Sequence, residues 1–214
     1  ENLKNNQDDL AVKDLEKLLE KYPNDSLASQ ALYKLSTIYL NWQNDPASGL
    51  GALDKLVKTY PESKQAKQAK LEIEEFPDYI LNKTESLRKK DMVKEALDHL
   101  MYLTVNYSNH QLIAKAQYML GDIYMNDLRD FKTAIQEYRK VIENHKGSIQ
   151  EPHALFMIGY IYANVLNDMQ SAKIEYEEFL NRFPEHELSP SVKFEIEYLG
   201  KSVDEIPALK HITT

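Results

Sequence analysis

The chain has 214 residues, a formal net charge of −8 and no cysteine. The lack of cysteine excludes disulfides and thiolate chemistry and leaves the redox compartment open. The negative charge argues against a nucleic-acid partner, because phosphate binding needs a concentrated basic surface. No stretch approaches the roughly 20 apolar residues that cross a bilayer. Six glycines and eight prolines are few for this length, which favours an all-helical chain.

A four-residue skeleton recurs five times along the chain. It has a small residue, bulky apolar residues four and seven positions later, and usually an aromatic residue at position eleven. The copies are Ala11/Leu15/Leu18/Tyr22, Gly49/Leu53/Leu56/Tyr60, Ala96/Leu100/Leu103/Tyr107, Ala134/Tyr138/Val141/His145 and Ala172/Tyr176/Phe179/Phe183. Successive copies lie 38, 47, 38 and 38 residues apart. A period in this range predicts an α-solenoid of stacked helix pairs.

Each skeleton is expected on a helix, because spacings of four, seven and eleven return to one helical face. Three copies end in an aromatic residue followed by proline, which stops a helix. These pairs are Tyr22-Pro23, Tyr60-Pro61 and Phe183-Pro184. We therefore expect the skeletons on the second helix of each pair.

A second recurring string marks the first helices. It ends in an asparagine, and an aspartate follows four residues later. The copies are Ile38-Tyr39-Leu40-Asn41 with Asp45, Ile123-Tyr124-Met125-Asn126 with Asp130, and Ile161-Tyr162-Ala163-Asn164 with Asp168. We expect each asparagine to end its helix in a left-handed conformation, and each aspartate to cap the helix that follows.

The 47-residue step, between the second and third skeletons, departs from the 38-residue period of the array. A helix over 64–76 resembles a predicted capping helix over 189–200, which Ser189 would start with Pro190 in its first turn. Between the two halves, Pro77 interrupts the helical pattern. The sequence therefore predicts two joined arrays, 1–76 and 78–200, followed by a weakly structured tail over 201–214.

These strings resemble the tetratricopeptide family, over nearly the whole chain. The first-helix columns of that family read here Leu32/Leu35-Ser36/Tyr39, Gln117/Leu120-Gly121/Tyr124 and Leu155/Ile158-Gly159/Tyr162. The resemblance implies a right-handed superhelix of antiparallel helix pairs, with about five repeats and a C-terminal capping helix. Two features depart from the family: the period is 38 rather than 34, and bulky residues replace alanine in one second-helix column, at Leu18, Leu56, Leu103, Val141 and Phe179. Long-period arrays of this kind resemble bacterial cell-envelope lipoproteins of the outer-membrane assembly and cell-division coordinator types.

Catalytic signatures are absent from the sequence. None of the six histidines has the four-residue spacing of a helical zinc pair. There is no phosphate-binding glycine loop, and adjacent carboxylates such as Glu177 and Glu178 point about 100° apart on a helix. We therefore predict a protein that is not an enzyme, with no catalytic residue, no metal site and no cofactor.

The family resemblance implies that the first helices line a concave groove. Three aromatic residues occupy one inward-facing column of these helices, and other groove columns hold polar and apolar residues. The candidate peptide-binding residues are Tyr33, Tyr118, Phe156, Tyr160, Lys115 and Met125. An aromatic row of this kind could grip an extended or helical peptide. The alternative interpretation is that the rings pack against the first helix of the next repeat. Only Lys115 supplies a cation, which speaks against a clamp for a peptide carboxylate.

Three functions are consistent with these observations. The leading one is a scaffold that binds a protein or peptide in its groove, in the periplasm or outside a bacterial cell, although a cytoplasmic location stays open. The second is a structural subunit that assembles head-to-tail with copies of itself through its solenoid ends, into rings, filaments or tubes, because we expect residues 8–21 to form a second helix without a first helix before it. The third is an outer-membrane assembly lipoprotein, attached to the membrane only through a lipid anchor upstream of Glu1.

Overall fold

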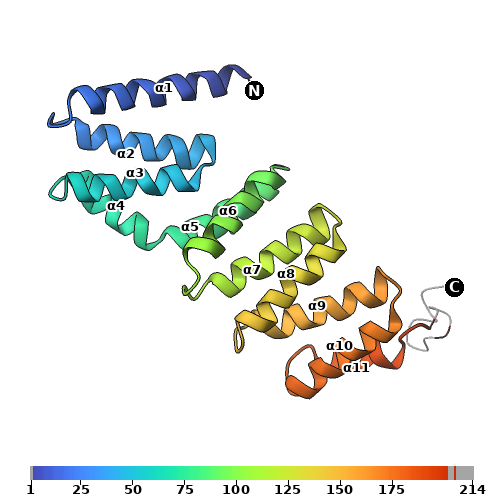
Figure 1. Cartoon of the computed structure of the whole chain (residues 1–214). Coiled ribbons are helices and arrows are strands. Elements are labelled where there is room, and N and C mark those ends of the chain that lie inside the picture. Colours follow the sequence, from blue (N-terminus) through green and yellow to red (C-terminus); the bar gives the residue numbers. More distant parts are fainter. Residues whose placement is uncertain (1, 202–204, 206–214) are drawn as a thin grey trace. The chain divides into compact units, whose positions relative to one another are not determined.

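The computed structural model describes residues 2–201 and 205, and every regular element in that part of the chain is helical. The elements are α1 (Asn2–Lys21), α2 (Ala28–Ile38), η1 (Tyr39–Gln43), α3 (Pro46–Thr59), α4 (Lys64–Glu74), α5 (Phe76–Arg88), α6 (Val93–Asn106), α7 (Ile113–Asp122), η2 (Ile123–Asp127), α8 (Phe131–Asn144), α9 (Gln150–Asn164), α10 (Met169–Arg182) and α11 (Ser189–Glu197). The segments η1 and η2 are π-helical turns that continue α2 and α7. The predicted α-solenoid of helix pairs is confirmed (Figure 1).

The backbone forms two compact units, Glu1–His110 and Gln111–Thr214. In unit 1, α2 pairs with α3 and α5 pairs with α6, while α1 packs on α2 and α4 packs on α3. In unit 2, α7 pairs with α8, α9 pairs with α10, and α11 packs on α10. Each helix contacts mainly its neighbours in sequence, as the repeat pattern requires.

The predicted junction at Pro77 lies inside unit 1. There α4 ends at Glu74, and α5 begins at Phe76 with Pro77 in its first turn. Pro77 is buried in this structure. The division into two repeat arrays, 1–76 and 78–200, stays a prediction. The weak structure expected of the tail over 201–214 also stays a prediction, because only Lys201 and Glu205 of that segment are among the described residues.

The five skeletons all lie on second helices, namely α1, α3, α6, α8 and α10. In the last four of these helices the first three skeleton residues are buried. The copy on α1 is only half-buried, because it packs only on α2 and its continuation η1. The helices α1, α3 and α10 end one residue before the aromatic residue of the aromatic-proline pairs, as predicted.

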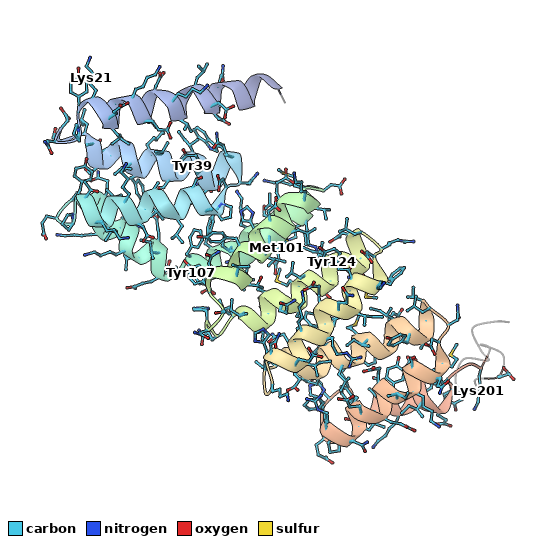
Figure 2. The ribbon with its side chains drawn as sticks, viewed as in Figure 1. Lys21, Tyr39, Met101, Tyr107, Tyr124 and Lys201 are labelled. Atoms are coloured by element: carbon cyan, nitrogen blue, oxygen red, sulfur yellow. The ribbon has the colours of Figure 1, made fainter. Side chains whose placement is uncertain are left out.

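The aspartate caps are also confirmed. The carboxylates of Asp45, Asp130 and Asp168 accept hydrogen bonds from backbone N–H groups three residues later, at 3.0, 3.1 and 3.0 Å. These bonds satisfy donors that have no partner within the helix. Six residues before the capping aspartates Asp45 and Asp130, Tyr39 and Tyr124 lie at equivalent positions near the ends of their first helices (Figure 2).

The expectation of left-handed asparagines at 41, 126 and 164 is wrong. Asn41 and Asn126 lie within π-helical turns, and Asn164 is the last residue of α9. The left-handed residues come three positions later, at Asn44, Arg129 and Asn167, with φ of 53°, 54° and 53°. The physical reason is a wide final turn, in which the N–H of each capping aspartate donates to the carbonyl of the tyrosine six residues earlier: Tyr39, Tyr124 and Tyr162.

The capping helix is confirmed as α11, but Ser189 does not cap it. The N-cap residue is Leu188, and its side chain makes no capping hydrogen bond. Ser189 is instead the first helical residue, and its hydroxyl donates to the carbonyl of Phe183 at 2.7 Å. The hydroxyl therefore ties α11 to the end of α10.

In both helix pairs of unit 2 a glycine of the first helix faces a tyrosine ring of the second. A Cβ atom added to Gly121 would lie 2.5 Å from Cε1 of Tyr138, and one added to Gly159 would lie 2.5 Å from Cε1 of Tyr176. Both tyrosines are fully buried. The equivalent positions in the α2–α3 pair hold Ser36 and the smaller side chain Leu53, both of which are also buried. The size of the second-helix residue is therefore matched to the first-helix position that it covers.

Replacing Gly121 with alanine is expected to destabilise the protein by about 1–2 kcal/mol. Overpacking of a core typically costs about 1–3 kcal/mol, and the higher helix propensity of alanine offsets up to ~1 kcal/mol of it. Gly51→Ala is the matched control, because a Cβ atom there meets nothing within 4 Å, and this variant should be stabilised by about 0.5–1 kcal/mol. Chemical denaturation of the variants measures both changes. Equal changes in the free energy of unfolding for Gly121→Ala and Gly51→Ala would contradict the close packing of Gly121 against the Tyr138 ring.

The aspartate caps predict a pH dependence of stability. Hydrogen bonds from the Thr133 hydroxyl and N–H lower the pKa of Asp130, and those from Ser171 lower the pKa of Asp168. Because the folded-state pKa is depressed, this stabilisation is present above about pH 4 and is lost as the pH falls further. Asparagine caps a helix without titrating. The melting temperature of an Asp130→Asn/Asp168→Asn variant should therefore fall less between pH 7 and pH 3 than that of the wild type, and parallel falls would contradict this assignment.

Candidate functional site

The predicted groove residue of unit 1, Tyr33, contacts the unpaired helix α4. The hydroxyl of Tyr33, on α2, donates to the carboxylate of Glu72 on α4. Burial, together with the hydrogen bond and the charge of Glu72, raises the pKa of Tyr33 to about 12. One turn earlier, the Ser29 hydroxyl donates to Gln65 of α4 at 3.3 Å. Tyr33 thus contacts α4, the unpaired helix that follows the α2–α3 pair, and it stays partly exposed.

In unit 2, Tyr118 of α7 lies between its own pair and the next. Its ring centroid is 5.2 Å from that of Tyr138 on α8 and 6.5 Å from that of His153 on α9. Burial, with a smaller contribution from the Asp122 carboxylate, raises the pKa of Tyr118. The ring is partly exposed, so it can contact a ligand as well as the core.

Phe156 and Tyr160 continue this aromatic surface on α9. Their ring centroids lie 6.4 Å apart, and Phe156 also lies 6.1 Å from Tyr176 of α10. Both residues are partly exposed. We define the aromatic row of unit 2 as Tyr118, His153, Phe156 and Tyr160. It occupies two consecutive first helices, and its inner edge rests on the two tyrosines that cover Gly121 and Gly159.

The two remaining candidates have different environments. Lys115, on the first turn of α7, is exposed. Met125, on η2, is partly buried against the core of unit 2, and its sulfur lies 3.9 Å from the Tyr138 hydroxyl. Lys115 is therefore available to a ligand, whereas Met125 mainly supports Tyr138.

Two hollows lie elsewhere, between successive second helices. In unit 1 a hollow of about 480 Å³ separates α1 from α3, and its lining includes Leu19, Leu35 and Gly51. In unit 2 a hollow of about 490 Å³ separates α8 from α10. The arginines that line the second hollow are engaged in ion pairs, Arg139 with Glu175 and Arg182 with Glu178. The sequence did not indicate either hollow, because both depend on how far apart the second helices lie.

A buried carboxylate joins the start of α9 to the end of α10. Glu151 is 2% exposed, accepts the Gly147 N–H at 2.6 Å and forms an ion pair with Arg182. The partner charge and the hydrogen bond compensate for its burial. This contact fixes the first turn of α9, which carries His153.

The described residues contain one group of three potential metal ligands, His153, His186 and Glu187. Sequence spacing gave no sign of this group, because its members come from different elements of unit 2. None of the described helices is both long and apolar enough to traverse a bilayer.

Comparison with known proteins identifies the family. The tetratricopeptide repeat model matches residues 2–25, 30–63, 115–148 and 153–186, which is more than half of the chain. The chain belongs to the tetratricopeptide repeat family. The last two segments begin 38 residues apart, and the residues between them, 149–152, are the N-cap and the first three residues of α9.

One solved structure similar to the chain is a tetratricopeptide repeat protein from Parabacteroides merdae ATCC 43184. The two chains are 14% identical with a TM-score of 0.41, and the match covers 87% of this chain and 64% of that chain. No curated protein matches the sequence.

Proposed function

We propose that the protein is a non-enzymatic scaffold that binds an extended or helical peptide of a partner protein along the aromatic row of unit 2. Domains of this family typically bind protein partners. The observation that carries the proposal is the set of partly exposed rings on α7 and α9, with centroid separations of 6.5 Å for Tyr118–His153 and 6.4 Å for Phe156–Tyr160.

These rings are suitable anchors because they are already fixed in the free protein. Tyr118 and Phe156 rest on the buried rings of Tyr138 and Tyr176, so a ligand loses little of its binding energy to ordering them. A buried aromatic contact contributes about 1.5–3 kcal/mol. Exposed Lys115 lies one turn before Tyr118 on the same helix and would favour an acidic residue in the ligand.

The groove is tested with a peptide selected from a display library against the wild-type protein. Lys115→Ala/Tyr160→Ala should weaken its binding at least about tenfold, which corresponds to about 1.4 kcal/mol. Tyr118→Ala/Phe156→Ala should weaken it more, because it removes two ring contacts. Fluorescence anisotropy measures the dissociation constants, and circular dichroism shows whether each variant is folded.

The matched control is Ile174→Ala, which removes a 56% exposed apolar side chain from the second helix α10 of the same unit. Its dissociation constant should equal that of the wild type. If the folded Lys115→Ala/Tyr160→Ala variant binds every selected peptide as tightly as the wild type does, the aromatic row is not the binding site.

A bacterial cell envelope is the compartment that we propose for this binding. The support is the resemblance of the long-period array to envelope lipoproteins, and the outer-membrane assembly type is the more specific alternative. Sequencing the gene upstream of the codon for Glu1 tests both: a signal segment that ends in a cysteine supports them, and the lack of any export signal contradicts them.

Self-assembly through α1 is the remaining alternative, and the packing of α1 does not favour it. Its apolar residues Val12, Leu15 and Leu19 pack against α2 and its continuation η1. Among the described side chains of α1, those exposed to solvent are charged or polar apart from Leu10, which is 59% exposed. Light scattering over a concentration series distinguishes a constant monomer mass from growing oligomers.

A further inference from the structure

Three side chains with metal-binding atoms converge at the C-terminal end of unit 2. His153 lies on the first turn of α9, and His186 and Glu187 lie in the turn between α10 and α11. One ligand atom from each of the three lies within 4.8 Å of the other two. Both imidazoles are partly buried and Glu187 is exposed, so an ion can reach the group from solvent.

Contacts on its own helix orient the imidazole of His153. Its Nδ1 lies 2.9 Å from the backbone carbonyl of Ile149. A carbonyl oxygen only accepts hydrogen bonds, so Nδ1 carries the ring proton and Nε2 keeps its lone pair. This arrangement is the usual one for a metal-binding histidine, because the carbonyl fixes the tautomer and the direction of the ring.

Aromatic rings hold the imidazole of His186. Its centroid lies 5.3 Å from that of His153, 5.8 Å from Phe179 and 6.5 Å from Phe183. Its Nδ1 accepts the Leu188 N–H at 3.2 Å. If Nε2 is the ligand atom, the ring proton moves to Nδ1 and faces the Leu188 N–H, so this hydrogen bond is lost and the ring has to turn away from that donor.

We propose that His153, His186 and Glu187 bind one divalent transition-metal ion of the Zn²⁺ type, with water completing the coordination. Two imidazoles and a carboxylate are a common ligand set for zinc. Ligand atoms of a tetrahedral zinc site lie about 3.4 Å apart, so small rotations of the partly exposed side chains close the site. The neighbouring Glu185 and the net charge of −8 favour a cation.

The ion would tie the start of α9 to the turn before α11. A ligand that binds the folded state alone raises its stability by mass action. The capping helix α11 would therefore be held more firmly when the ion is present. The edge of the aromatic row would also be fixed, because His153 contacts Tyr118. This site does not depend on the proposed peptide binding.

The test is a calorimetric titration of the full chain with Zn²⁺, together with melting curves with and without Zn²⁺. The wild type should bind one tight equivalent and melt at a higher temperature with Zn²⁺, and a chelator should reverse the shift. His153→Gln and His186→Asn should each weaken the tight equivalent at least tenfold and abolish the shift. Glu187→Gln should weaken binding less, because two imidazoles remain.

The variants are chosen to distinguish loss of metal binding from disruption of the turn between α10 and α11, in which His186 accepts the Leu188 N–H. His186→Asn retains a side-chain acceptor for the Leu188 N–H, as Asp25 does at the equivalent turn, where it accepts the Leu27 N–H at 2.8 Å. His145→Gln is the control, because it removes a partly buried imidazole of the same unit that is outside the group. It should bind like the wild type. A wild type that shows no tight equivalent, or variants at 153 and 186 that bind like His145→Gln, would overturn the proposal.

Discussion

The fit between a second-helix side chain and the first-helix position beneath it is the constraint on which the structure of each repeat depends. In unit 2 a tyrosine ring lies directly on a glycine, at Tyr138 with Gly121 and at Tyr176 with Gly159. The α2–α3 pair has a second close contact of this kind at another level, where a Cβ atom added to Gly49 would lie 2.4 Å from the side chain of Leu40. In these pairs a glycine therefore leaves room for a bulky side chain of the partner helix, as dense packing requires.

The candidate binding surface depends on this fit. The buried rings of Tyr138 and Tyr176 form the support on which Tyr118 and Phe156 lie. The Tyr138 hydroxyl donates to Asp122 at 2.6 Å, whereas the hydroxyl of Tyr176 has no hydrogen-bond partner among the described residues. A binding face built on rigid helices and buried rings is preorganised. The repeat architecture thus provides fixed anchors without a separate loop or lid.

Local features of this fold could be predicted from the sequence, and contacts between elements could not. The skeletons and the caps at Asp45, Asp130 and Asp168 follow from spacing within one helix or turn, so they were predicted correctly. The helix ends at Asn41 and Asn126 were not, because a π-helical turn depends on hydrogen bonds that propensity does not encode. Whether Tyr33 and Tyr118 face a ligand or the next helix depends on the distance between helices. In the structure Tyr33 contacts α4, Tyr118 contacts α9, and both remain partly exposed. The group His153, His186 and Glu187 was missed because only the stacking of repeats brings it together.

The most direct test of the packing constraint is a double-mutant cycle that gives the α7–α8 pair the side chains of the α2–α3 pair. The free energy of unfolding is measured for Gly121→Ser, for Tyr138→Leu and for the double variant. If the two positions share one space, Gly121→Ser is strongly destabilising beside the tyrosine ring and is tolerated beside leucine. The double variant should then be more stable than the sum of the single changes predicts, by about 1 kcal/mol or more. Additive effects of the two substitutions would contradict the account.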